Sequence, residues 1–82
     1  MLEQINEPIE VEAYFGPQGG ARPLKFIRHG REYVIEKVNL MYSKWSGRTK
    51  LHYFAVSDGA NYYKLCLDSE NLKWTLVEIY AE

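Results

Sequence analysis

The residues best suited to chemistry in this sequence are cations and aromatic rings that alternate along its middle third. Residues 21–50 carry eight Lys or Arg and only two glutamates, whereas residues 1–20 carry four glutamates and no base. Cations neutralise phosphates and aromatic rings stack on bases, so a surface for single-stranded nucleic acid would need this pattern. The candidate residues of a surface for nucleic acid or for a protein partner are Arg28, Arg31, Tyr42, Lys44, Trp45, Arg48 and Lys50.

A second interpretation of the basic segment needs no ligand. The cations could form the solvated outer face of two hairpins and be partly paired with acidic strands beside them. The net charge of −1 over 82 residues is far from the basic excess of typical nucleic-acid binders. Charge alone therefore leaves both interpretations open.

The two tryptophans have different settings. Trp45 lies beside a Ser-Gly turn and close to two cations, where a large ring is hard to bury completely. An aromatic residue at a hairpin tip is a candidate stacking platform or partner anchor; the alternative is a cap over an open end of a barrel. Trp74 alternates with leucines, so we expect it in the core.

Residues for catalysis are few. Cys66 is the only cysteine, and His29 and His52 are separated from it and from each other. His52 could meet Cys66 across neighbouring strands, but the alternation around Cys66 favours a small buried side chain. These three residues do not make a metal-ligand set, and no glycine loop has the phosphate-binding pattern. The sequence therefore predicts a protein that is not an enzyme and uses no metal or other cofactor.

The first quarter of the chain predicts one strand and one loop. Strict alternation from Ile9 to Phe15 indicates a half-buried strand over residues 8–15. Residues 1–7 are expected to be a tail that could include a turn of helix. Residues 16–23 are rich in glycine and proline, which predicts a flexible loop. The apolar face of the strand holds Ile9, Val11, Ala13 and Phe15.

The rest of the chain repeats one local pattern five times, a run of β-branched and aromatic residues followed by a short turn. This repetition predicts a meander of five antiparallel strands over residues 24–80. Asp58-Gly59 is the strongest hairpin signal, and Gly30 is expected to supply a positive φ. The second run is too long for one flat strand, so we expect a bend or a bulge near residues 39–42. The runs are 24–28, 32–45, 50–57, 62–67 and 72–80.

The expected fold is all-β. It is one domain over residues 1–82, an antiparallel meander of five to six strands in chain order, curled into a small barrel or roll of SH3-like size. Curling is expected because it hides strand edges that would otherwise aggregate. A single cysteine fits a reducing compartment, and no long apolar stretch or signal-peptide pattern is present. We therefore expect a cytoplasmic protein that is not in a membrane, as a monomer or a homodimer.

The spacing of aromatic and turn residues over residues 22–80 resembles a small bacterial domain of unknown function. That domain is found beside or fused to Y-family DNA-polymerase-like proteins of actinobacterial mutagenesis cassettes. The family is usually richer in arginine where this chain has Ile27 and Ser43-Lys44. The resemblance therefore implies a genomic neighbourhood rather than a set of nucleic-acid contacts. The matching residues are Arg22-Pro23, Phe26, Gly30-Arg31, Tyr33, Val38, Trp45, Tyr53-Phe54, Val56, Tyr63, Leu65, Asp68, Trp74, Leu76 and Ile79-Tyr80.

Two functional hypotheses follow. The first is a non-enzymatic interaction domain, accessory to DNA repair or replication proteins, in which Trp45 and Tyr42 anchor a protein partner or an edge strand accepts a peptide. The second is a weak binder of single-stranded nucleic acid, with the cations on phosphates and the aromatic rings under bases.

Overall fold

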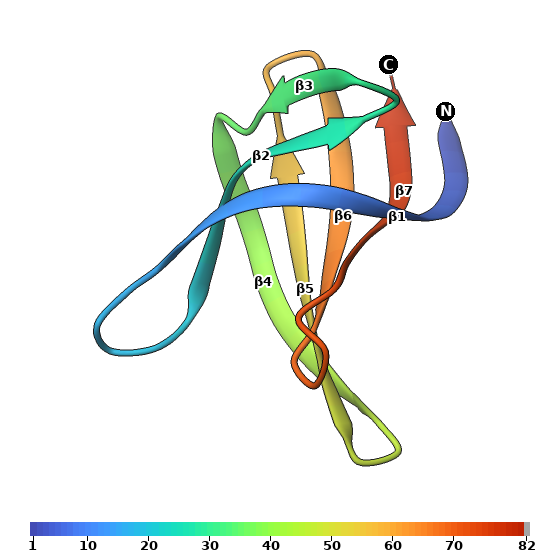
Figure 1. Cartoon of the computed structure of the whole chain (residues 1–82). Helices are drawn as coiled ribbons and strands as arrows, with labels where there is room; N and C mark the ends of the chain where they lie inside the picture. Colours follow the sequence, from blue (N-terminus) through green and yellow to red (C-terminus); the bar gives the residue numbers. More distant parts are fainter. Residues whose placement is uncertain (82) are drawn as a thin grey trace.

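Residues 1–81, the part of the chain that the structure describes, form seven strands and no helix in the computed structural model. The strands are hydrogen-bonded into one antiparallel sheet in the order β3-β2-β1-β7-β6-β5-β4 (Figure 1). The all-β antiparallel prediction is confirmed, whereas the expected number of five to six strands is wrong. The strands are β1 (Leu2–Phe15), β2 (Ala21–Arg28), β3 (Arg31–Val34), β4 (Lys37–Ser46), β5 (Thr49–Ser57), β6 (Asn61–Asp68) and β7 (Trp74–Ala81).

β1 begins at Leu2, so the expected tail over residues 1–7, with its turn of helix, is wrong. Residues 2–9 of β1 pair with β7, and residues 10–15 pair with β2. β1 therefore lies in the middle of the sheet, and the order of strands departs from chain order at this point. The polar residues near the N-terminus gave no local strand signal because the partner that stabilises them, β7, is at the other end of the chain.

The loop between β1 and β2 covers residues 16–20, which is shorter than the expected 16–23. β2 begins at Ala21 and includes the buried Pro23, which lies opposite Ala13 beside a register shift in β1. A proline has no N–H to donate to a ladder, so it is tolerated in a strand beside such an irregularity.

The seventh strand results from a break in the predicted run 32–45. The N–H of Ile35 donates to the carbonyl of Leu24 in β2, and the N–H of Glu36 donates to the carbonyl of Ser57 in β5, both at 2.9 Å. Within two residues the chain thus leaves β2 and joins β5, which divides the run into β3 and β4. The predicted bulge is present at Asn39, where the register between β4 and β5 shifts.

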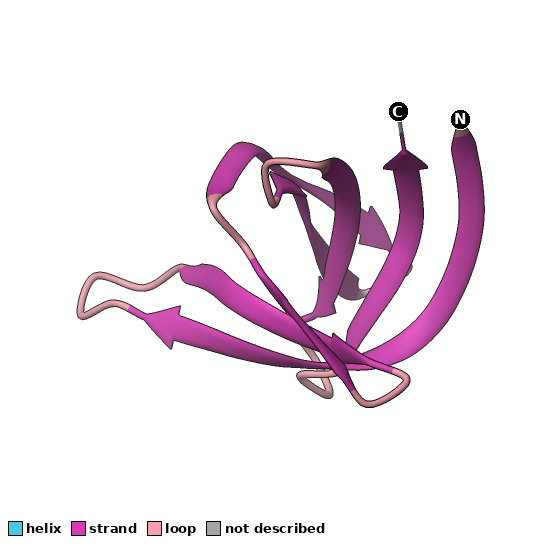
Figure 2. Ribbon diagram, turned by 90° about the horizontal axis from the view of Figure 1, so that it is seen from above, coloured by secondary structure: helices cyan, strands magenta, loops and turns pink. Residues whose placement is uncertain are grey.

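The sheet folds over itself but does not close into a barrel. β1, β2 and β3 lie across β5, β6 and β7 (Figures 1 and 2), while the edge strands β3 and β4 form no ladder with each other. Of the two expected forms, a small barrel or a roll, the closed barrel is therefore not formed. β3 has only four residues, so beyond the crossing at residues 35–36 no strand pairs with the outer edge of β4.

The core lies between the two layers. Phe26 of β2 stacks on Tyr33 with ring centroids 4.8 Å apart, and its ring meets that of Tyr63 in β6 edge-on at 5.1 Å. Trp74 is 8% exposed and lies 5.4 Å from Phe54, so its predicted core position is confirmed. The buried cluster contains Phe26, Phe54, Val56, Tyr63, Leu65, Leu67, Trp74 and Leu76.

The apolar face of β1 is only partly as predicted. Ile9, Val11 and Ala13 pack against the core cluster, which confirms three of the four expected residues. Phe15 is 59% exposed, so its expected burial is wrong. The register shift between Glu12 and Ala13 interrupts the alternation, and Phe15 lies at the end of the hairpin.

The turn between β5 and β6 is built on Asp58, as the Asp-Gly signal predicted. Its carboxylate accepts hydrogen bonds from the N–H groups of Ala60 and Asn61 and from the hydroxyl of Tyr63. Burial acts to raise the pKa of Asp58, but these hydrogen bonds outweigh it and lower the pKa below its usual value. Burial and the bond to Asp58 raise the pKa of Tyr63 to about 12.

We expect Trp74→Ala to lower the free energy of unfolding by about 3–5 kcal/mol, because it empties a large site in the core. Trp45 is 69% exposed, so Trp45→Ala is the matched control and should change this free energy by less than about 0.5 kcal/mol. Urea unfolding followed by circular dichroism measures both. Equal losses for the two variants would contradict the assignment of Trp74 to the core.

The pKa of Tyr63 predicts a stability change at alkaline pH. Because the folded pKa of about 12 exceeds the ordinary value of 10.0, the unfolded chain loses this proton first, and the free energy of unfolding falls as pH rises from 10 to 12. Tyr63→Phe removes this contribution, so the stability difference between the wild type and Tyr63→Phe should shrink across that range. Urea unfolding at several pH values measures it, with the exposed Tyr80→Phe as control. A difference that stays constant would contradict the raised pKa.

Candidate binding cleft

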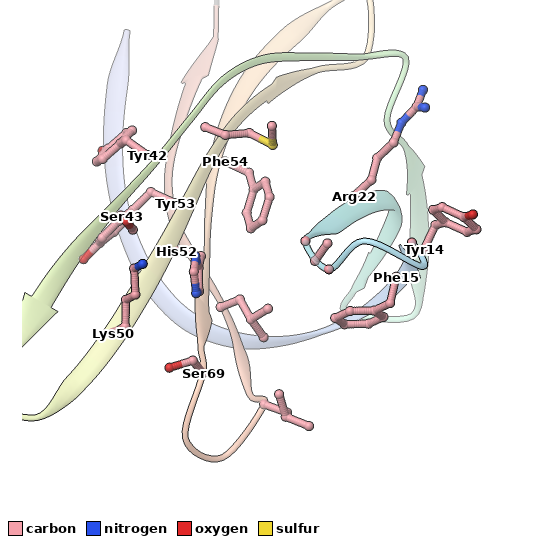
Figure 3. Close-up of a pocket in the computed structure, with 17 residues that line it drawn as sticks. Tyr14, Phe15, Arg22, Tyr42, Ser43, Lys50, His52, Tyr53, Phe54 and Ser69 are labelled. Atoms are coloured by element: carbon pink, nitrogen blue, oxygen red, sulfur yellow. The ribbon is translucent and has the colours of Figure 1, made fainter.

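A cleft of about 750 Å³ lies between the β1–β2 hairpin and the β4–β5 hairpin (Figure 3). Tyr14, Phe15 and Arg22 border it on one side. The other side is formed by β4 and β5, and the turn after β6 contributes Leu72 at the rim. The residues contributed by β4, β5 and β6 are Met41, Tyr42, Ser43, Lys50, His52, Tyr53, Phe54 and Leu67.

Strand alternation explains which side chains of β4 and β5 enter the cleft. Met41 lies opposite Phe54, and Ser43 lies opposite His52, so these four side chains share one face. Phe54 is 4% exposed and belongs to the core, whereas Met41 is 61% exposed. The cleft is therefore the open continuation of the core, at the end where the layers separate.

The charge of the cleft has one sign. Arg22 and Lys50 line it, and no carboxylate does so among the described residues, although the whole chain has 11 Asp and Glu. Residues 37–57 contain four Lys or Arg and no acid. None of these four cations forms an ion pair with a carboxylate within residues 1–81. An anionic group would therefore meet uncompensated cations here.

Tyr42 and Lys44, two of the predicted site residues, lie on the opposite face of β4. Tyr42 stacks on Tyr53 at 5.1 Å, and the Nζ atom of Lys44 is 5.8 Å from both ring centroids. The Nζ atom of Lys64 is 5.9 Å from the Tyr42 ring. One face of Tyr42 is thus covered by another ring, and Figure 3 shows Tyr42 pointing away from the cleft.

Trp45, Arg48 and Lys50 meet at the tip of the β4–β5 hairpin. Trp45 lies opposite Lys50, whose Nζ atom is 5.8 Å from the centroid of the indole. Lys50 lines the cleft and Trp45 does not, so Trp45 lies beside the cleft next to Lys50, with Arg48 in the adjoining turn. Trp45 is not among the residues packed against the core, so nothing supports a role as a cap.

Arg28 and Arg31 lie elsewhere, at the β2–β3 hairpin, far from the β4–β5 tip (Figure 1). The Nε atom of Arg28 is 3.2 Å from the carboxylate of Glu7, and the guanidinium of Arg31 lies 5.5 Å from the Tyr33 ring. The seven predicted residues therefore do not form one surface. Of the seven, Trp45 and Lys50 lie on the side of the β4–β5 hairpin that faces the cleft.

Sequence reasoning missed the contribution of the β1–β2 hairpin to the cleft. Tyr14 and Phe15 were placed in a strand with a buried face, and Arg22 was placed in a loop. Their role depends on where this hairpin lies relative to β4, which no local pattern shows. The sequence signal that could have indicated this role was the pair of adjacent aromatic residues, Tyr14 and Phe15, before a glycine-rich turn.

Cys66 and His52 do not form a catalytic pair. Cys66 lies opposite Tyr53, whereas His52 lies opposite Leu67, so the two side chains are on opposite faces of the sheet. Burial raises the pKa of the Cys66 thiol, which disfavours the nucleophilic thiolate. Within residues 1–81, no three His, Cys, Asp or Glu side chains gather where they could hold a metal ion.

No protein-family model, no curated protein and no solved structure matches this chain. The resemblance to the bacterial domain of unknown function therefore stays a prediction. The described residues include no helix that could cross a membrane.

Proposed function

We propose that this chain is a non-enzymatic interaction domain that binds a protein partner in the cleft. The observation that carries the proposal is a group of large apolar side chains exposed around one concave site. Tyr14, Phe15, Met41 and Leu72 are 57%, 59%, 61% and 65% exposed, and all four line the cleft. Exposed apolar side chains gathered at a concave surface are typical of an interaction site.

The cellular role follows from the family resemblance. We propose a bacterial, cytoplasmic domain that is accessory to DNA repair or replication proteins, with a Y-family polymerase-like protein as the partner to test first. In this proposal Phe15 and Met41 anchor the partner within the cleft, and Trp45 contacts it beside the cleft. Aromatic residues in such positions commonly supply most of the binding energy.

We expect Phe15→Ala and Trp45→Ala each to weaken capture of such a polymerase-like protein by about tenfold or more, while the folded spectrum is kept. Val34→Ala is the matched control, because Val34 is 61% exposed but lies on β3, outside the lining of the cleft. Biolayer interferometry with the immobilised chain measures the affinities. Equal effects at all three positions, or none, would exclude the cleft as the binding surface.

Binding of single-stranded nucleic acid is the second candidate. It is favoured by the exposed indole of Trp45 next to Lys50 and by the absence of carboxylates from the lining of the cleft in the described part of the chain. Bases would stack on Trp45, and phosphates would meet Arg48 and Lys50.

For this candidate, we expect the affinity for an oligothymidylate to fall steeply with salt, and Lys50→Gln or Arg48→Gln to reduce the slope of log K against log salt by about 1. Arg31→Gln is the control, because Arg31 is at the distant β2–β3 hairpin. Fluorescence anisotropy at several salt concentrations measures the slope. Binding that ignored salt, or that survived loss of Arg48 and Lys50 unchanged, would refute nucleic-acid binding at this site.

A further inference from the structure

Two strand edges without partners border the cleft. β4 pairs with β5 along its length and is the last strand of the sheet. The first residues of β2 pair with β1, while β3 pairs with β2 only from Lys25 to Arg28. Residues 21–23 of β2 therefore have no strand on their other side.

Residues of both edge segments line the cleft. Met41, Tyr42 and Ser43 all line the cleft, although successive side chains of a strand point to opposite faces. His52, Tyr53 and Phe54 of the inner strand β5 also line it consecutively. What distinguishes β4 is its unpaired outer edge. Ala21 and Arg22 line it in the same way from β2.

We propose that the cleft accepts an extended, acidic peptide segment of the partner, which pairs with the outer edge of β4 as an added strand. This inference rests on the proposed function and specifies the chemistry of the partner. Strand addition uses the free N–H and C=O groups of an edge for affinity and side-chain pockets for specificity. Residues 40–46 of β4 span about 23 Å at about 3.3 Å per residue, which suits a segment of about seven residues.

Charge complementarity selects an acidic segment. Arg22 and Lys50 line the cleft without a carboxylate partner among residues 1–81, and Lys44 lies on the opposite face of the β4 segment that the peptide would pair with. The nearby Glu70 is exposed and accepts a hydrogen bond from the hydroxyl of Thr49. The apolar lining by Phe15 and Met41 favours apolar residues at alternate positions of the same segment.

The same observations disfavour two other occupants. A second copy of this chain, paired through its own β4, would bring two lysines and no acid to this edge. A nucleic-acid strand has no peptide backbone to satisfy the alternating donors and acceptors of β4, and the net charge of the chain is −1. An acidic peptide can pair with the free backbone groups of the β4 edge and can also neutralise the cations beside it.

The test selects binders from a displayed library of random twelve-residue peptides with the folded chain as bait. We expect enriched peptides that alternate Asp or Glu with apolar residues, and replacement of their acids by lysine should weaken binding by about tenfold or more. Failure to enrich any peptide, or enrichment of basic peptides, would overturn the proposal. Salt-dependent binding of oligothymidylate without peptide binding would assign the cleft to nucleic acid instead.

Backbone methylation of the best peptide distinguishes strand addition from simple docking. The amides of an added strand point alternately toward and away from β4, so N-methylation of one alternate set should cost about tenfold or more and methylation of the other set little. Equal effects of both sets would overturn the pairing. If Phe15→Ala and Trp45→Ala still impair partner capture in that case, the proposed function stands and only the strand addition fails.

Proline substitution in β4 tests the same edge from the side of the chain. The N–H groups of Tyr42 and Ser43 point in opposite directions within the strand, one toward β5 and one toward the outer edge of β4. We expect one of Tyr42→Pro and Ser43→Pro to keep the folded spectrum and to lose peptide binding by about tenfold. A folded proline variant that binds the peptide with unchanged affinity would overturn the proposal, and if neither variant folds, the methylated peptides decide.

Discussion

The rest of the structure depends on the crossing of the chain between two layers at Ile35 and Glu36. The N–H of Ile35 bonds to Leu24 in one layer, and the N–H of Glu36 bonds to Ser57 in the other. These two adjacent residues hold the layers together at one end, where Tyr33 completes the aromatic group of the core. Because the chain changes partners there, β4 continues without a strand on its outer side. The core and the open cleft are therefore two results of the same crossing.

The uneven charge of the sequence is divided by the fold into a paired and an unpaired region. Arg28 is paired with Glu7, and Lys64 is paired with Glu78, so the acidic residues of β1 and β7 neutralise cations near them. Residues 37–57 receive no such carboxylate within the described part of the chain. The two interpretations of the basic segment thus apply to different places. At the β2–β3 end the cations are solvated or paired, as the interpretation that needs no ligand expects. At the β4–β5 hairpin the cations have no carboxylate partner within residues 1–81 and are available to an anionic partner.

Features encoded by a few adjacent residues could be predicted from the sequence, and features that depend on distant partners could not. The turn at Gly30 was predictable because the residue adopts a φ of 75°, which favours glycine, and the Asp58 turn has an equally local cause. The crossing at Ile35 has no glycine or proline to mark it, so residues 32–45 were interpreted as one strand. At the site, Trp45 was predictable from its turn, whereas Phe15 joins the cleft only through the packing of one hairpin against another strand.

An unpaired strand edge is a liability, and β4 is protected against aggregation along only part of its length. Lysines and bulges are the usual protection of such edges; β4 has its bulge at Asn39, near its start. Beyond the bulge, residues 40–46 pair regularly with β5, and Leu40, Met41 and Trp45 are 56%, 61% and 69% exposed. The part of the edge that lacks a bulge carries these exposed apolar side chains and includes Met41, Tyr42 and Ser43, which line the cleft. Lys44 lies within this stretch, but no bulge does, and the added strand proposed above would satisfy its free backbone groups.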